Sequence, residues 1–303
     1  MKDNILNITR RDNVATSQLC KELKSATYLG SATHCRASIY SFSGGELRGL
    51  MTEVGRLRRE SFEAVGVSMP ECEAVEASDR DGTYRQLIVW DDEERAIIGG
   101  YRYAVGRDVV PEKLSMGRYF RLTPRFSAEY LPRSIELGRS FIQSRYQCGH
   151  NAKTIFALDA LWEGLARVVE RECVDYLVGR VTFYPSLGVR ARNLLIGFMR
   201  YVFPERESLV AAHTPLRGGM SHRWLRRCFV GCTPKENYRI LISRMRSMRR
   251  SVPPIISSYM RLSPSMQTFD LYRNDDLGGV AECGIMLTIA DLYDDVKRRY
   301  FSF

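Results

Sequence analysis

The stretch SIELGRSFI, residues 134–142, places a carboxylate and a guanidinium inside a run that is otherwise largely apolar. The apolar residues predict a core strand, yet Glu136 and Arg139 carry opposite charges. A buried carboxylate without a partner costs several kcal/mol or shifts its pKa. Two hypotheses follow: a structural ion pair, or a catalytic base beside an arginine that binds an anion.

The periodic segments around this stretch predict one α/β domain. An amphipathic helix is expected from Gly45 to Gly66, and a longer one of about 20 residues from Ala152. The predicted strands are 38–42, 85–90, 95–106, 134–142, 174–183, 255–262 and 283–289. A mixed central sheet with flanking helices accommodates this order. We expect a single domain over 41–303, with 1–40 as an N-terminal extension.

The eight cysteines and the N-terminal segment favour a reducing compartment. The sequence begins MKDNILNITRRDN, which has no apolar signal-peptide core, and the cysteine spacings are irregular. Reduced thiols and a cytoplasmic location are expected. Cys228 and Cys232 lack a second ligand pair, so no metal site is predicted.

Most of the positive charge is concentrated in one segment. The chain carries a net charge of +10, and residues 217–250 hold ten basic residues against one acidic residue, Glu236, which gives 10 − 1 = +9. Such a segment attracts nucleic acid, an anionic membrane or an acidic protein, or else it is a solvated helix face. It contains no helix-turn-helix pattern, paired zinc ligands or RNP-like strand, so no nucleic-acid partner is expected.

Several short motifs, taken in order, resemble one known family. They are RLRRESF (56–62), QLIVWD (86–91), GGYRY (99–103), ELGRS (136–140), ALWEGLARVV (160–169), DYLVGRVTF (175–183), SPSMQTF (263–269) and GIMLTI (284–289). Together they resemble the GNAT-superfamily bacterial N-acyltransferases that make lipoamino acids, including the glycine and ornithine N-acyltransferases. The ELGR-type strand is also similar to that of acyl-homoserine lactone synthases. The resemblance covers roughly residues 15–303.

The resemblance implies a fold and a place for the acyl donor. The fold would be GNAT-like, with a mixed, mostly antiparallel sheet and flanking helices. The strand at 134–142 and the strand at 175–183 would splay apart to admit a thioester. A backbone N–H near Gly138 or Ser140 would then donate to the thioester carbonyl, a type of contact that contributes about 3–4 kcal/mol to transition-state stabilisation.

The resemblance also implies roles for charged residues. Glu136 would take the proton from the acceptor amine, as a general base does. Arg139 would keep Glu136 ionised or hold an anionic substrate group. Arg102 and Arg59 would bind the substrate carboxylate, for which arginine is suited. The alternative is that Arg102, Arg139 and Glu136 form one inert buried network.

Two acidic residues before QLIVWD are weaker candidates. Asp79 and Asp81 match the acidic pattern of the family only in part, because Arg85 stands where a second acid is expected. They are either substrate-binding residues or members of a solvated acidic loop.

The segment RYQCGH, 145–150, departs from the usual coenzyme A loop. Cys148 and His150 stand where small residues normally let backbone N–H groups approach a pyrophosphate. This favours the acyl-phosphopantetheine of an acyl carrier protein as donor over acyl-CoA, and no bound cofactor is expected. Acyl carrier proteins are acidic, so Arg223, Arg226 and Arg227 in the basic segment would contact one.

The expected function is therefore N-acylation of a small amino acid. A (3-hydroxy)acyl chain would pass from acyl carrier protein to the α-amine of glycine, with ornithine as the alternative acceptor. A partner O-acyltransferase could act next, and the basic segment could contact the inner membrane peripherally. The alternative from a different class is a basic protein that binds nucleic acid or a membrane surface.

Overall fold

The computed structural model describes residues 16–147 and 152–302, and it divides into two compact units. Unit 1 contains 16–62, Pro70–Tyr103 and Arg139–Val168, and unit 2 contains Glu63–Met69, Ala104–Gly138 and 169–302. Cys148 and His150, and residues 1–15 of the predicted N-terminal extension, lie outside the described residues.

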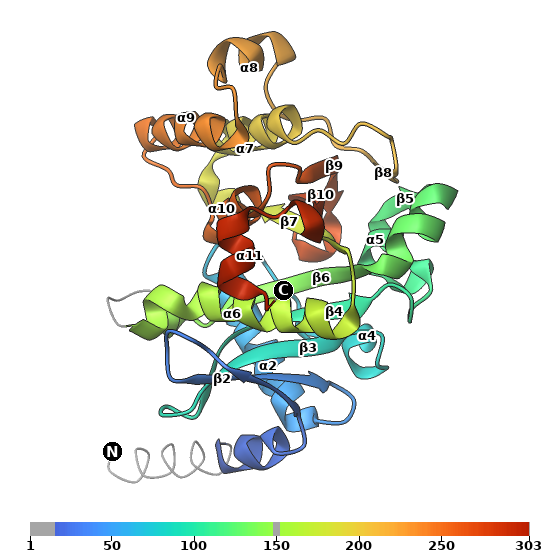
Figure 1. Ribbon diagram of the computed structural model, residues 1–303, viewed down its shortest axis with the longest axis vertical. Coiled ribbons are helices and arrows are strands. Elements are labelled where there is room, and N and C mark those ends of the chain that lie inside the picture. Colours follow the sequence, from blue (N-terminus) through green and yellow to red (C-terminus); the bar gives the residue numbers. More distant parts are fainter. Residues whose placement is uncertain (1–15, 148–151, 303) are drawn as a thin grey trace. The chain divides into compact units, whose positions relative to one another are not determined.

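Eight strands form a mixed, mostly antiparallel sheet in the order β1-β2-β3-β4-β6-β7-β10-β9 (Figure 1). Their bounds are β1 Thr27–Ser31, β2 Ala37–Ser43, β3 Arg85–Asp91, β4 Ala96–Val105, β6 Ser134–Ile142, β7 Tyr176–Phe183, β9 Gln267–Asn274 and β10 Val280–Thr288. Two short strands, β5 (Phe120–Leu122) and β8 (Val210–Ala212), pair separately. The predicted GNAT-like sheet, the 85–106 hairpin and the strand 134–142 are confirmed.

Helices flank this sheet. Their bounds are α2 Arg48–Glu63, α3 Glu71–Ala74, α4 Ala77–Arg80, α5 Ser115–Tyr119, α6 Ala152–Glu172, α7 Val189–Val202, α8 His222–Cys228, α9 Pro234–Ser247, α10 Pro254–Leu262 and α11 Asp294–Tyr300. The long helices expected from Gly45 and from Ala152 are α2 and α6, and α6 has 21 residues.

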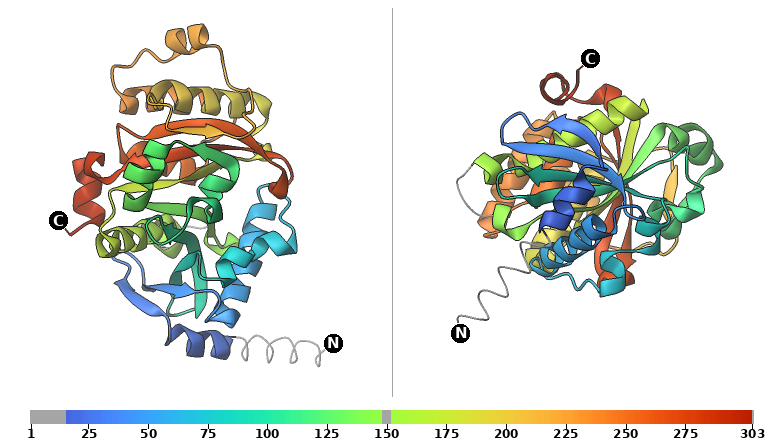
Figure 2. Two further views of the ribbon diagram at one scale, coloured as in Figure 1. Left: turned by 90° about the vertical axis from the view of Figure 1, so that its right-hand side faces the viewer. Right: turned by 90° about the horizontal axis from the view of Figure 1, so that it is seen from below.

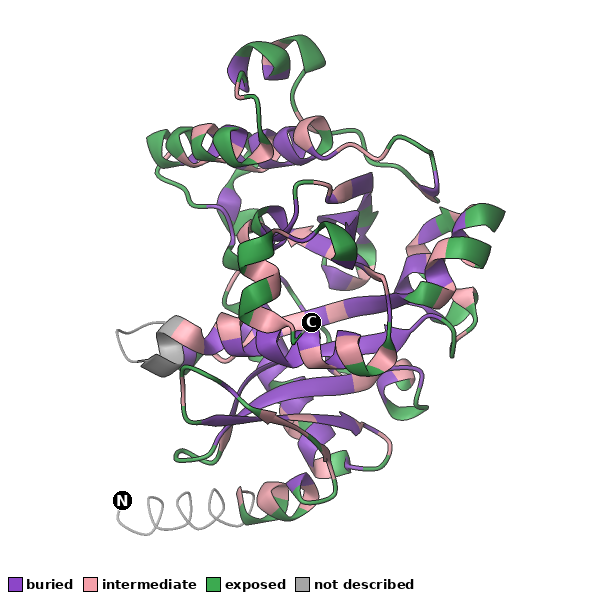
Figure 3. Cartoon of the chain, viewed as in Figure 1, coloured by how far each residue is buried: buried purple, intermediate pink, exposed green. Residues whose placement is uncertain are grey.

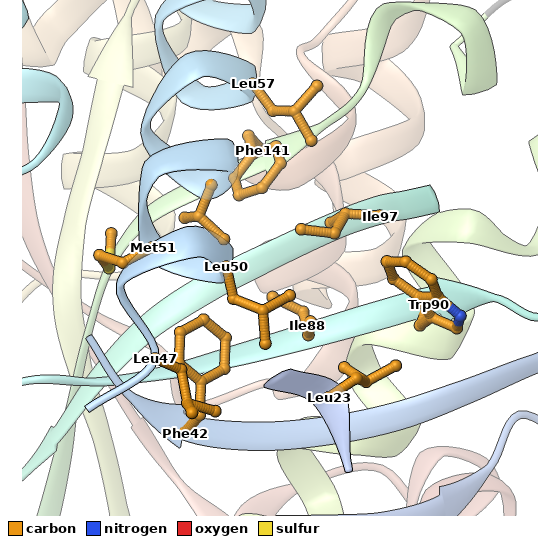
Figure 4. Packing of buried hydrophobic residues seen from close by; sticks show 11 residues of the cluster. Leu23, Phe42, Leu47, Leu50, Met51, Leu57, Ile88, Trp90, Ile97 and Phe141 are labelled. Carbon is orange, nitrogen blue, oxygen red and sulfur yellow. The ribbon is translucent and has the colours of Figure 1, made fainter. Parts of the chain in front are cut away.

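The core of unit 1 forms between α2 and the strands beside it (Figure 4). Leu50, Val54 and Leu57 recur at helical spacing, and each is at most 1% exposed. They pack in one cluster with Ile88 of β3 and Phe141 of β6. This apolar stripe sets the rotation of α2 about its axis, so it determines which other residues of the helix are buried.

The segment 255–262 is a helix, so the predicted strand there is wrong. Helix α10 begins at Pro254, and proline is well suited to the first turn of a helix. Ile256, Tyr259 and Met260 are buried, at a spacing of three and four residues. That spacing is helical, whereas the prediction followed the β-branched isoleucines.

In unit 2, the basic segment forms two helices that pack on α7 (Figure 2). Phe198 of α7 contacts Phe229, just after α8, with their ring centroids 4.9 Å apart. Thr233 and Glu236 form a capping box that begins α9. All ten basic residues of 217–250 are exposed. In Figure 3, exposed residues are green, and green predominates on α8 and α9.

Strands β6 and β7 pair in parallel over only four residues. Their register runs from Ser134–Tyr176 to Leu137–Gly179, although β7 continues to Phe183 alongside β10. Arg139, two residues after the last pair, has φ = 50°, which is unfavourable for a residue with a side chain. Such an irregularity inside a strand re-aims side chains and ends pairing.

Candidate active site

Glu136 is buried in unit 2, just before the β6–β7 pairing ends. It is 1% exposed, and its Oε2 accepts a hydrogen bond of 3.2 Å from the backbone N–H of Met116. Met116 belongs to α5, which is therefore in contact with this carboxylate. The carboxylate lies within the fold rather than at its surface, as the apolar residues around it predict.

A row of charged side chains continues from Glu136 across one face of the sheet. Glu136 is opposite Val178 on β7, and Arg180, two residues further, lies on the same face. Arg180 is opposite Gly284 of β10 and donates to Glu282 over 2.7 Å. Burial opposes the charge of Arg180, but Tyr272, Glu282 and Glu136 outweigh burial and raise its pKa well above the usual value.

Glu282 is the fixed anion of this row. Its carboxylate accepts hydrogen bonds from Thr182 (2.7 Å), Asn274 (2.9 Å) and Tyr272. Burial would raise the pKa of Glu282, but Arg180 and these hydrogen bonds lower it. Arg180 and Glu282 were not selected from the sequence, although each is a charge inside an apolar strand, which is the same signal that selected Glu136.

Unit 1 contains a second buried ionic cluster, centred on Arg58 and Asp79. The two side chains are both 0% exposed and pair at 3.0 Å. Gln86 of β3 accepts from Arg58 and donates to Asp79 over 2.9 Å. Burial would raise the pKa of Asp79, but Arg58 and Arg102 lower it. The alternative of a solvated acidic loop is therefore wrong for Asp79.

Glu76 joins the two predicted arginines within the same cluster. It accepts from Arg102 at 2.7 Å and from Arg139 at 2.6 Å, and Arg139 also pairs with Glu73 at 2.7 Å. The guanidinium of Arg102 lies over the ring of Tyr84, 4.3 Å from its centroid. Burial would raise the pKa of Glu76, but Arg102 and Arg139 outweigh it and lower the pKa to about 2.

The other predicted residues are found at the following places. Asp81 is exposed, and its carboxylate accepts from the N–H of Thr83 at 2.9 Å. Arg59 is half-buried beside a cavity, while its neighbour Arg58 is the buried one. Gly138 and Ser140 are half-buried on β6. Arg223, Arg226 and Arg227 are exposed on α8.

The low pKa of Glu76 predicts an acid-sensitive fold. A carboxyl whose pKa is lower in the folded state stabilises the protein above its unfolded pKa, and this contribution is lost as the pH falls. We expect the free energy of unfolding to drop by up to about 3 kcal/mol between pH ~5 and pH ~2 because of Glu76. Urea unfolding of Glu76→Gln should show a shallower pH dependence over this range.

The matched control for that experiment is Glu46→Gln, which removes an exposed carboxyl from the same unit. In this variant, the free energy of unfolding should depend on pH as steeply as in the wild type. Equal slopes in wild type and Glu76→Gln would contradict the proposed contribution of Glu76.

Cysteine and acidic side chains give no indication of a metal centre in the described part of the chain. The seven cysteines placed within residues 16–147 and 152–302 are free thiols. No group of three or more metal-binding side chains is brought together among those residues. No helix in the same ranges has the length and apolarity that a membrane crossing requires.

Comparison with known proteins identifies the class. Residues 57–157 match the family model described as an acetyltransferase (GNAT) domain, and the observed sheet agrees with that fold. The protein is thus an acyltransferase of the GNAT class.

Two curated relatives give the family. Glycine N(alpha)-acyltransferase of Bacteroides thetaiotaomicron is 36% identical over 297 residues, which cover 95% of this chain and 88% of that protein. Glycine N(alpha)-acyltransferase of Phocaeicola vulgatus is 33% identical over 272 residues, 87% of this chain and 83% of that protein. The chain belongs to the same family as these two proteins.

Two solved structures share more distant similarity. The N-acyl amino acid synthase FeeM from uncultured soil microbes is 13% identical, with a TM-score of 0.34 over 48% of this chain and 72% of that chain. The acyl-homoserine lactone synthase LasI is 18% identical, with a TM-score of 0.35 over 62% and 86%. These scores are too low to support a residue-by-residue comparison.

Proposed function

We propose that this acyltransferase transfers a (3-hydroxy)acyl chain from acyl carrier protein to the α-amine of a small amino acid, with glycine as the first candidate. The observation that carries the proposal is Glu136, a buried carboxylate on β6 located just before the β6–β7 pairing ends. The family relatives named as glycine N(alpha)-acyltransferases support glycine as acceptor. Ornithine is the alternative acceptor.

The proposed reaction uses Glu136 as general base. An ammonium cannot attack a thioester, so the acceptor first loses a proton to the Glu136 carboxylate. The amine nitrogen then forms a bond to the thioester carbon, and the C–S bond breaks. The second proton of the nitrogen passes to the leaving phosphopantetheine sulfur, and Glu136 releases the first proton to solvent, which restores its carboxylate. Arg180, which pairs with Glu282, lies on the same face of the sheet as Glu136 and supplies a positive charge beside it.

Arg139 is the proposed contact for an anionic group of a substrate. Its Nε and Nη2 donate to Glu76, but its buried Nη1 has no hydrogen-bond partner among the residues that the structure describes. A buried donor without a partner is costly, and a bound carboxylate would satisfy it. Arg102 is 1% exposed and Arg139 is 8% exposed, so Arg139 is the more accessible candidate of the two.

The exposed basic segment supports an acidic carrier protein as donor. None of its ten basic residues pairs with a carboxylate within 4 Å in the described ranges 16–147 and 152–302. Unpaired surface cations steer an acidic partner and raise its association rate. The same charge also suits an anionic membrane surface, which keeps peripheral membrane contact as a second role for these helices.

Neutralising three arginines at the centre of this segment should weaken binding of the acyl carrier protein without changing the catalytic step. We expect Arg223, Arg226 and Arg227 all changed to Gln to raise KM for acyl carrier protein by about tenfold and to leave kcat near wild type, because rim charges act on association. The difference in KM between this variant and the wild type should become smaller at high salt. The control changes Arg121, Arg298 and Arg299, also exposed in unit 2, to Gln. An equal rise in KM with the control would exclude a specific docking surface.

The proposed activity is tested with purified protein. Acyl carrier protein or coenzyme A, each carrying the same 3-hydroxyacyl chain, is supplied with glycine or ornithine, and products are identified by mass spectrometry. We expect N-acylglycine, formed faster from the carrier protein. Absence of any N-acyl amino acid with all four combinations of donor and acceptor would refute the proposal. Salt-sensitive binding to duplex DNA or to acidic vesicles would then favour the alternative class.

A further inference from the structure

We propose that unit 1 carries a second binding site, a pocket for a phosphate group along the outer side of α2. A cavity of about 770 Å³ lies between α2, the loop at Gly44 and Gly45, and the segment that contains α3 and α4. This volume is in the range of small-molecule sites. Among the described residues, its lining includes neither Arg102 nor Arg139, so it is a separate site from the buried cluster.

The lining of the cavity carries an excess of uncompensated positive charge. Its charged members are Arg48, Arg56, Arg59, Arg80 and Glu71. Arg56 is neutralised by two carboxylates of its own helix, Glu53 at 2.6 Å and Glu60 at 2.5 Å. The other three arginines have no carboxylate within 4 Å in the described part of the chain. With Glu71 and the second carboxylate beside Arg56 subtracted, the uncompensated charge is 3 − 1 − 1 = +1.

A net positive charge with three guanidinium groups that have no carboxylate within 4 Å among the described residues selects for an anion. A phosphate monoester carries about −1.5 to −2 at pH 7 and has three acceptor oxygens. Guanidinium groups bind phosphate oxygens bidentately, and three of them can share one group. A carboxylate offers only two acceptor oxygens, so it satisfies fewer guanidinium N–H groups than a phosphate does. Phosphate is therefore the favoured ligand chemistry.

The walls of the pocket are fixed before a ligand arrives. A Cβ on Gly55 of α2 would lie 2.3 Å from Cγ2 of Val75, so helix and wall approach as closely as glycine allows. A Cβ on Gly44 would lie 2.5 Å from the backbone oxygen of Asp79. Arg58 also donates to the backbone oxygen of Ala74 over 3.2 Å. Such preorganisation lowers the entropy cost of binding.

The wall links the pocket to the buried cluster. The segment from Glu71 to Arg80 lines the cavity and also carries Glu76 and Asp79, the carboxylates that hold Arg102, Arg139 and Arg58. A ligand that binds the folded state alone stabilises it. Phosphate is therefore expected to raise the unfolding temperature of the protein, and this result does not depend on acyl transfer.

The test is calorimetric titration of the full chain with inorganic phosphate at constant ionic strength. We expect saturable binding with one site per chain, and weaker binding of acetate. Arg59→Gln and Arg80→Gln should each weaken phosphate binding by roughly tenfold or more, the loss expected for one charge-assisted contact. The matched control is Arg95→Gln, which removes an exposed arginine of unit 1 outside the pocket and should change the affinity by less than about twofold.

Three results would overturn the proposal: no saturable phosphate binding, equal affinity for phosphate and acetate, or equal weakening in Arg95→Gln. The source of the phosphate is distinguished with vesicles of phosphatidylcholine containing phosphatidic acid. A lipid ligand predicts that Arg80→Gln reduces vesicle binding together with phosphate binding. A soluble phosphate ester predicts that Arg80→Gln loses phosphate binding while vesicle binding stays unchanged.

Discussion

Glu136→Gln is expected to lower kcat for N-acyl amino acid formation by about a hundred- to ten-thousand-fold, the usual contribution of a general base. Glutamine keeps the size of the side chain and an oxygen that accepts the hydrogen bond from the Met116 N–H, so the fold should persist. What it loses is the ability to take a proton from the ammonium. The rate is measured by mass spectrometry with saturating donor and acceptor.

The control for this variant is Glu112→Gln, an exposed carboxyl in the same unit. Its kcat should equal that of the wild type. Circular dichroism and urea unfolding must show that Glu136→Gln is folded. A folded Glu136→Gln protein with more than about a tenth of wild-type kcat would show that Glu136 is not the base.

Arg58→Met is expected to lower the free energy of unfolding by about 3–5 kcal/mol, because it removes the closer of the two cations that pair with buried Asp79 and leaves only Arg102, 3.8 Å away. Methionine fills part of the volume, so the loss arises mainly from the weakened pairing of the Asp79 carboxylate. Asp79 is 0% exposed and cannot recover this energy from water. The loss is measured by urea unfolding at pH 7.

Arg56→Met is the matched control, because it lies two residues earlier on the same helix and pairs with Glu53 and Glu60 at the surface. Exposed pairs of this kind contribute about 0–1 kcal/mol. The prediction requires a clear difference between the two variants. If Arg58→Met is as stable as Arg56→Met, the buried cluster does not hold unit 1 together.

The sequence predicts best the elements whose periodicity is local. The bounds of β6 agree with SIELGRSFI, and the 21-residue helix α6 follows from its apolar face. The same logic could have selected Arg58. Leu50, Val54 and Leu57 define the buried face of α2, and residue 58 lies on that face, eight positions after Leu50 and four after Val54.

The partners of the charged residues could not be predicted in this way. Arg139 pairs with Glu76, which is 63 positions away in the sequence, and no local spacing indicates that contact. Arg139 has a positive φ, which breaks the alternation on which strand predictions depend. The row that joins Arg180 to Glu282 depends on the register of β7 and β10, which is a property of the folded sheet.

Glu136 is proposed to remove the proton of the acceptor amine, and the pH dependence of kcat/KM for glycine tests this role most directly. In the wild type, activity should persist well below the pKa of the amine. In Glu136→Gln, only amine that is already neutral can react, so the residual rate should rise about tenfold per pH unit up to that pKa. Parallel pH profiles for the two proteins would contradict the claim.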